Sequence, residues 1–139
     1  MTKNYEIIEH TADIGIRVKG RTLAELFINA ASALFDIIAE KKTNTRSRPA
    51  SIRIQQTADS QEELLKNWLN ELLFLSQTKE LIFTDFKIDE LTPAAIKARG
   101  IGSAAQDFRI NVEVKAATFH QLKIEKADNA WQAEIIFDV

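Results

Sequence analysis

The chain has 139 residues, of which 45% are hydrophobic and 27% charged, as is typical of one soluble globular domain. It has no cysteine, which excludes disulfides, thiolate metal sites and cysteine nucleophiles. The net charge of -2 argues against a dedicated nucleic-acid binder, which usually carries a basic excess. The N-terminus lacks the apolar core of a signal peptide, and no window approaches the ~20 apolar residues of a membrane span. We therefore expect one cytoplasmic domain over residues 1–139, without a membrane partner.

Two segments have the period of an amphipathic helix. The first begins at Thr22, where Thr22 and Glu25 have the spacing of a capping box, and the second begins in the same way at Ser60 and Glu63. In each segment apolar residues recur at intervals of three and four, so each predicts a helix with one buried face. These residues are Leu23, Leu26, Phe27, Ala30, Leu34 and Ile38 in the first segment, and Leu64, Trp68, Leu69, Leu72 and Leu75 in the second.

Most of the remaining chain alternates between apolar and polar residues, the pattern of half-buried strands. Such runs cover residues 14–18, 51–56, 84–89 and 131–138, with further strand-like runs at Ile96, Ile110, Val112 and Val114. Neighbouring strands are connected too closely for helical crossovers. The pattern therefore predicts an α+β fold, a mostly antiparallel β-sheet with two amphipathic helices packed on one face. We expect loops at residues 40–49, which are polar and basic, and at 100–107, which are rich in small residues.

The sequence contains none of the common catalytic motifs. There is no P-loop and no GxSxG elbow, and the GxG at Gly100 and Gly102 lacks the third glycine of a dinucleotide-binding turn. The two histidines, His10 and His120, do not form a paired zinc motif. We therefore expect a protein that is not an enzyme.

Carboxylates occur at two unusual places. Asp13 lies in the polar segment HTADIGI without a lysine or arginine next to it in the sequence, and Asp138 precedes the terminal carboxylate of Val139. If the last strand ends beside this segment, three carboxylates converge and repel one another unless a cation or proton compensates them. Oxygen ligands favour Ca²⁺, Mg²⁺ or Mn²⁺ over zinc. The alternative, which spacing alone favours, is that Asp13 is a turn or capping residue and Asp138 is merely solvated.

Three other residues are candidates for contact with a partner. His10 and Asp13 differ by an odd number, so they serve one site only if the chain turns between them. By strand alternation His120 shares a face with Thr118, which favours a structural role for this histidine. Lys115 is a candidate contact for a phosphate or an acidic partner, although most strand lysines are solvated.

Several blocks of the sequence, in order, resemble the archease family. They are HTADIGI at residues 10–16, TLAELFINAASALFDI at 22–37, WLNELLFL at 68–75, FTDF at 83–86, VKAATFH at 114–120, and the last strand with its final FDV. The blocks include both predicted helices and both ends of the chain. The likeness therefore covers nearly the whole sequence.

The resemblance implies a non-enzymatic activator of a GTP-dependent RNA ligase of the tRNA-splicing type. Such a ligase uses GTP and a divalent metal to guanylylate its own histidine, and an archease promotes this step and permits multiple turnover. The resemblance also implies a divalent ion, Ca²⁺ before Mg²⁺ or Mn²⁺, held by the side chains of Asp13 and Asp138 and an oxygen of Val139. tRNA or another RNA would be reached only through the ligase. The alternative is a general chaperone-like or RNA-binding module without a dedicated ligase.

Overall fold

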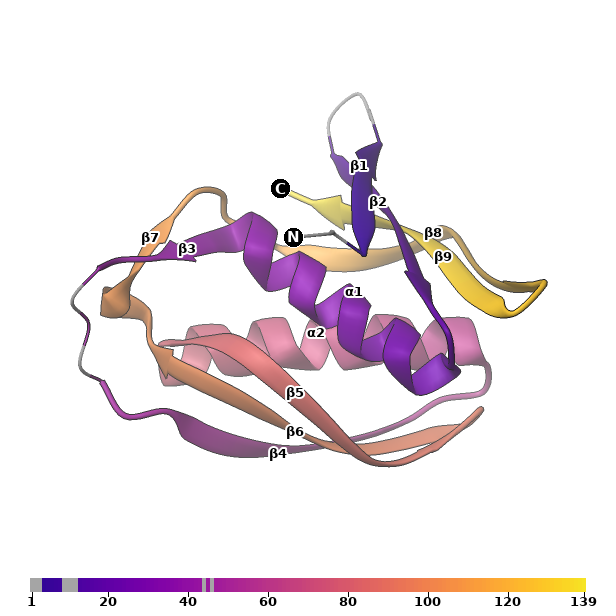
Figure 1. Ribbon diagram of the computed structural model, residues 1–139, viewed down its shortest axis with the longest axis horizontal. Coiled ribbons are helices and arrows are strands. Elements are labelled where there is room, and N and C mark those ends of the chain that lie inside the picture. The colour runs from indigo at the N-terminus through magenta and orange to yellow at the C-terminus, as the bar shows by residue number, and fades with distance from the viewer. Residues whose placement is uncertain (1–3, 9–12, 44, 46) are drawn as a thin grey trace.

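The computed structural model describes residues 4–8, 13–43, 45 and 47–139, and at 119–121 it describes the backbone alone. In this part of the chain two helices, α1 (Leu23–Ile38) and α2 (Gln61–Lys79), lie between two antiparallel sheets (Figure 1). The first sheet has the order β1 (Tyr5–Ile8), β2 (Ile14–Gly20), β9 (Ala130–Asp138), β8 (Ala116–Ala127). The second has the order β4 (Ala50–Thr57), β6 (Ala95–Ala104), β5 (Leu81–Thr92). The strands β3 (Ala39–Lys41) and β7 (Phe108–Ile110) form a separate pair, and a short 3-10 helix, η1 (Ala105–Asp107), precedes β7.

The predicted fold class is confirmed: the chain is α+β, mostly antiparallel, with two amphipathic helices on its sheets. The helices are covered on both sides, however, rather than on one. Helix α1 packs on β2 and β5, and α2 packs on β8 and β4. The apolar surface of α1 is wider than one stripe, because Ala31, Ala33 and Phe35 are buried in addition to the predicted residues from Leu26 onward. A second sheet covers this additional apolar surface.

Both helices begin where the capping patterns predict. The amide of Glu25 donates a hydrogen bond to the Thr22 hydroxyl at 3.0 Å, and the amide of Glu63 donates to the Ser60 hydroxyl at 3.1 Å. In each case the side chain satisfies one of the amides that the first helical turn leaves without a carbonyl partner. These caps fix the ends of β2 and β4 against the starts of the helices.

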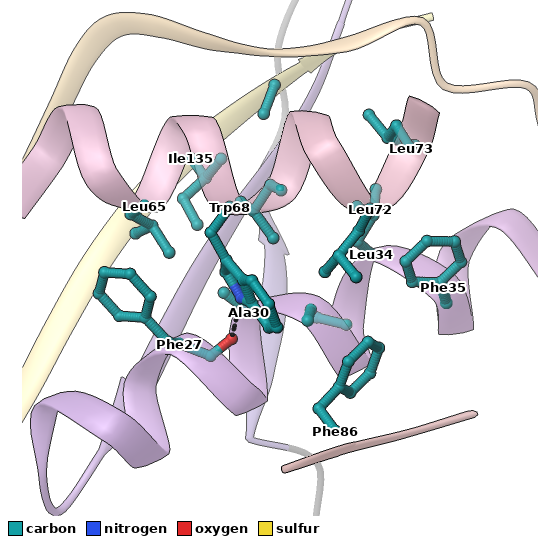
Figure 2. Packing of buried hydrophobic residues seen from close by; sticks show 14 of the residues in the cluster. Phe27, Ala30, Leu34, Phe35, Leu65, Trp68, Leu72, Leu73, Phe86 and Ile135 are labelled. Carbon is teal, nitrogen blue, oxygen red and sulfur yellow. Dashed lines mark hydrogen bonds between the residues drawn. The ribbon is translucent and has the colours of Figure 1, made fainter. Parts of the chain in front are cut away.

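The middle of the core is Trp68 on α2, which is 0% exposed (Figure 2). Its indole Nε1 donates a hydrogen bond to the carbonyl of Phe27 on α1 at 3.0 Å. Its ring meets that of Phe86 on β5 edge to face, with centroids 6.0 Å apart. One side chain therefore joins both helices and the second sheet, while its single polar group remains hydrogen-bonded.

The predicted loop at residues 100–107 is wrong over its first half, because Gly100 to Ala104 belong to β6, the middle strand of the second sheet. A Cβ added to Gly100 would lie 2.7 Å from the Phe83 ring, and one added to Gly102 would lie 2.7 Å from the Ile82 carbonyl oxygen. These glycines allow neighbouring groups to approach β6 closely. In the predicted basic loop, likewise, Glu40 and Lys41 belong to β3.

Candidate functional site at the end of the first sheet

The two halves of the predicted carboxylate cluster lie at the same end of the first sheet. The ladder between β2 and β9 ends with Ile14 opposite Phe137, and one step further these strands carry Asp13 and Asp138. Figure 1 shows the C-terminus emerging there beside β2. Residues facing each other across an antiparallel ladder share a face, with Cα atoms roughly 4.5–5.5 Å apart. The fold thus brings two segments more than a hundred residues apart in the sequence to one place.

We call Asp13, Asp138 and Val139 the acidic tip. Asp13 is half-buried at a bend, Asp138 is the exposed last residue of β9, and Val139 is 41% exposed. Among the described residues there is no group of three or more histidine, cysteine, aspartate or glutamate side chains able to hold a metal. The acidic tip has two such side chains, and the third predicted ligand is an oxygen of Val139.

Strand β8 supports the acidic tip from the other side of β9. Ala116 lies opposite Asp138, and the amide of Lys115 donates to the main-chain carbonyl of Asp138 at 2.8 Å. The main chain of Lys115 therefore helps to hold the last residue of β9 in place. Lys115 is an exposed residue, and its predicted role as a partner contact stays a prediction.

The other two candidate contacts cannot be placed as side chains. His10 lies outside the described residues, and of His120 only the backbone is described. That backbone lies in an irregular part of β8, between the pair Thr118–Ile136 and the pair Lys123–Glu134. Between these two pairs, β8 has four residues and β9 has only one. The prediction that His120 shares a face with Thr118 concerns its side chain and therefore stays a prediction.

Helix α2 closes the outer edge of β8 with side chains that the sequence patterns did not single out. The amide group of Asn70 donates to the carbonyl of Ala117 at 3.0 Å and accepts from the amide of Ala117 at 2.8 Å. Further along, Glu62 accepts from the amide of Ile124 at 3.1 Å. Asn70 thus replaces a neighbouring strand at the start of β8, next to the acidic tip. No sequence pattern indicated this role, because Asn70 lies off the predicted apolar stripe of α2.

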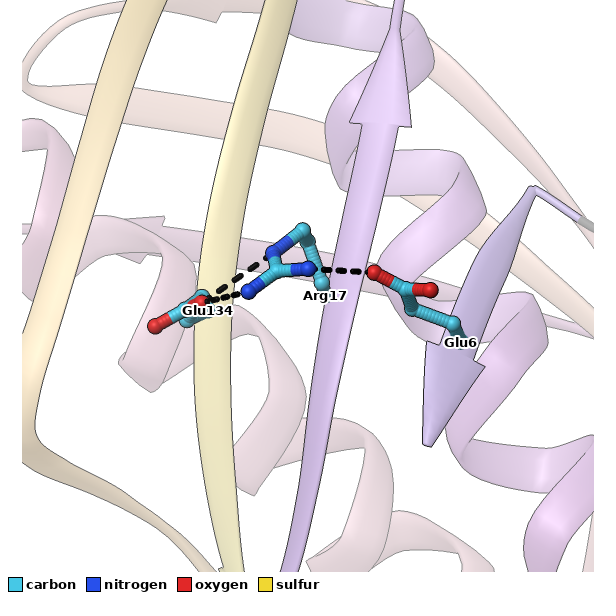
Figure 3. A network of polar contacts seen from close by, with 3 residues as sticks. All are labelled: Glu6, Arg17 and Glu134. Carbon is cyan, nitrogen blue, oxygen red and sulfur yellow. Dashed lines mark hydrogen bonds and ion pairs between the residues drawn. The ribbon is translucent and has the colours of Figure 1, made fainter. Parts of the chain in front are cut away.

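A row of charged side chains crosses the first sheet and joins three of its strands (Figure 3). Arg17 on β2 faces Glu6 on β1 and Glu134 on β9 in the strand register. Its guanidinium donates twice to Glu134, at 3.1 and 2.6 Å, and once to Glu6. The hydrogen bonds to Glu134, followed by the one to Glu6, raise the pKa of Arg17 above its usual value. The row fixes the relative register of the strands that lead to the acidic tip.

No helix in the described part of the chain is both long and apolar enough to cross a membrane. This finding agrees with the composition, in which long apolar runs are absent.

Comparison with known proteins identifies one family. The model of the archease protein family (MTH1598/TM1083) matches residues 5–139. The chain is 36% identical to a protein archease from Methanosarcina acetivorans, over 99% of this chain and 97% of that one. It is 37% identical to a protein archease from Pyrococcus furiosus, over 99% of both chains.

Two solved structures are similar along the whole chain. The solution structure of protein 1598 from Methanobacterium thermoautotrophicum has a TM-score of 0.75 and 30% sequence identity, and covers 99% of this chain and 100% of its own. A crystal structure from Thermotoga maritima, described as an archease and possible chaperone, has a TM-score of 0.62 and covers 95% of this chain and 94% of its own. At 22% identity, the second likeness concerns the fold alone.

Proposed function

Because the chain belongs to the archease family, we propose that it is a non-enzymatic activator of a GTP-dependent RNA ligase of the tRNA-splicing type. Its role is to promote guanylylation of the ligase and multiple turnover. tRNA or another RNA then interacts with this protein only indirectly, through the ligase that binds it. The observation that carries the proposal is the position of Asp13 and Asp138 one step beyond the last pair of the β2–β9 ladder.

The acidic tip has the donor chemistry of a hard divalent cation. The side chains of Asp13 and Asp138 and the terminal oxygen of Val139 are all oxygen donors, which suit Ca²⁺, Mg²⁺ or Mn²⁺. Carboxylates that lie close together repel one another, and a divalent ion would remove the repulsion. The exposure of Asp138 and Val139 leaves these donors accessible from solvent. When bound, the ion supplies a compact positive charge that can polarise phosphate oxygens.

The role of the protein's own residues is to position these donors. β2 and β9 are paired as far as Ile14 and Phe137, the residues next to the two aspartates, and the Lys115 amide holds the main chain of Asp138. A rigid acidic end of a sheet can approach the ligase active site, where nucleotide, metal and histidine must align, and lower the cost of that alignment. His10, Lys115 and His120 are the proposed contacts with the ligase around the acidic tip.

The test is guanylylation of the cognate ligase with GTP and divalent metal, in the presence and absence of this protein. Stimulation should be lost with Asp13→Ala and with Asp138→Ala, and residues added after Val139 should reduce it by removing the terminal charge. Asp128→Asn is the matched control, because Asp128 is an exposed carboxylate in the turn at the opposite end of β9. Full stimulation by both tip variants would reject the role of the acidic tip.

The same experiment addresses the alternative of a general chaperone-like or RNA-binding module. The Thermotoga maritima structure is described as a possible chaperone, and such a module needs no dedicated ligase. It predicts no stimulation by the wild-type protein. An RNA-binding module also predicts tight RNA binding that weakens steeply with salt.

A further inference from the structure

A second site lies on the side of the molecule where α1 is exposed between the two sheets. A cavity of about 540 Å³ is lined by residues of β1 from the first sheet, β5 from the second and the outward face of α1. Its volume is within the range of roughly 300–1,000 Å³ that is usual for ligand pockets. No residue of the acidic tip lines it.

The floor of this cavity is apolar and preformed. It includes Phe35 from α1, Phe83 and Phe86 from β5, and Phe108 from β7, each of them buried in the core. The rings of Phe35, Phe83 and Phe86 contact one another, with centroids 5.5 to 6.1 Å apart. Because these rings belong to the packed core, an incoming apolar group meets a surface that needs no rearrangement.

The rim of the cavity is acidic. Among the described residues it carries the carboxylates of Asp36 and Glu40 and one cation, Lys41. Glu40 forms an ion pair with Arg109. Asp36 accepts a hydrogen bond from the Tyr5 hydroxyl at 2.5 Å, and no cation in the described part of the chain pairs with it. Burial, followed by the hydrogen bond to Asp36 and the charge of Asp36, raises the pKa of Tyr5 to about 12.

An apolar floor below a carboxylate that pairs with no cation of the described residues suits an organic cation. A ligand with an anionic head would be repelled by Asp36 and Glu40, and a purely apolar ligand would leave Asp36 without a counter-ion. The aliphatic stem and charged head of arginine or lysine match both features, because such side chains place the stem on apolar surface and the charge at its edge.

The walls of the cavity indicate where such a side chain comes from. β1 and β5 are each the outer strand of their sheet among the described strands, and extended polypeptide segments dock at such edges. Ile7 is two residues beyond Tyr5 on the same face of β1 and is 64% exposed, which extends apolar surface along this edge. We infer that the groove between β1 and β5 binds an extended segment of a partner polypeptide, with an arginine or lysine of that segment directed to Asp36.

Two capped dipeptides that differ only in charge test this inference on the full-length protein: acetyl-Leu-Arg-amide and acetyl-Leu-Glu-amide. Two-dimensional amide NMR should show shifts confined to the groove, at residues 32–41 and 82–86, with the arginine peptide and none with the glutamate peptide. Asp36→Asn should weaken arginine-peptide binding about three- to tenfold, because it removes one partly solvated ion pair. Glu25→Gln, an equal charge loss on the exposed face of the same helix, should leave binding unchanged.

The single tyrosine of the chain gives an independent measurement. A guanidinium at Asp36 compensates the charge that helps to raise the pKa of Tyr5, so the tyrosinate absorbance should appear at lower pH with the arginine peptide bound. Arginine keeps its charge at this pH. Spermidine, a free polyamine, should bind more weakly than the arginine peptide, because it lacks the apolar group and the main chain. Equal binding of both peptides, equal binding by Asp36→Asn, or spermidine binding as tight as that of the peptide would overturn the inference.

Discussion

The helix layer and the acidic tip differ in how their residues are held. Trp68 is enclosed by both helices and the second sheet, and many apolar neighbours fix its position. The acidic tip is at the solvent-exposed end of a ladder, where the Lys115 amide and the strand register hold Asp138. The difference indicates a division of roles: the helix layer supplies stability, and the acidic tip is free to carry charges that contribute little to stability.

The largest effect is expected for Trp68→Ala. The substitution opens a cavity between the helices and leaves the Phe27 carbonyl without its indole partner, so the free energy of unfolding should fall by about 3–5 kcal/mol. Chemical denaturation measures the loss. Phe74→Ala is the control, because Phe74 is on the same helix but 58% exposed, and it should change stability by less than about 0.5 kcal/mol. Similar losses for both variants would contradict the assignment of Trp68 to the centre of the core.

Asn70→Ala should have an intermediate effect, because Asn70 connects the two regions. It leaves the amide and carbonyl of Ala117 without partners at the start of β8, at a cost of about 1–3 kcal/mol. Asn67→Ala, which removes one exposed hydrogen bond to the Thr57 carbonyl, is the matched control and should cost less. Stimulation of the ligase should also fall more with Asn70→Ala, since β8 supports the acidic tip. Equal effects of the two variants on stability would show that Asn70 does not hold this edge.

The helix layer could be predicted from sequence because its signals are local. The caps at Thr22 and Ser60 and the apolar intervals that follow them are properties of neighbouring residues, and the structure contains both helices at the expected positions. Strands of the second sheet were predicted at residues 51–56 and 84–89, but as parts of a single sheet, and half of its middle strand was missed for the opposite reason. Its middle strand contains Gly100 and Gly102, which resemble loop residues until the close approach of Phe83 and Ile82 is known.

From the sequence, the acidic tip could be predicted only on the assumption that the last strand ends beside Asp13. Asp13 and Asp138 are far apart in the sequence. No pattern of neighbouring residues predicts that β2 and β9 pair with each other. Family resemblance supplied that information, and the strand register agrees with it. The support from Asn70 and the irregular register of β8 near His120 depend on contacts between distant elements, which a single sequence does not encode locally.

The Tyr5–Asp36 pair combines features of both regions. It is a polar contact, like those of the acidic tip, but it joins β1 to a helix of the helix layer, α1. Burial, followed by the hydrogen bond to Asp36 and the charge of Asp36, raises the pKa of Tyr5 from 10.0 to about 12. The contribution of Tyr5 to stability is therefore complete below pH 10 and is lost as pH rises from 10 towards 12. Unfolding curves across this range should show a steeper fall for the wild type than for Tyr5→Phe. Below pH 10, the variant should be less stable by roughly 0.5 kcal/mol, the low end for a partly exposed hydrogen bond. Parallel pH dependences would contradict the raised pKa.

The smallest effect on stability is expected at the acidic tip itself. With chelator present, Asp13→Asn and Asp138→Asn should each change the free energy of unfolding by less than about 0.5 kcal/mol, because each removes repulsion between carboxylates as well as a charge. Saturating Ca²⁺ should raise the Tm of the wild type, since an ion that binds only the folded state stabilises it. Neither tip variant should show the full rise, whereas Asp128→Asn should show all of it. A loss of several kcal/mol in the free energy of unfolding of the tip variants without metal would show that Asp13 and Asp138 are structural residues. The contrast between the acidic tip and the helix layer would then fail.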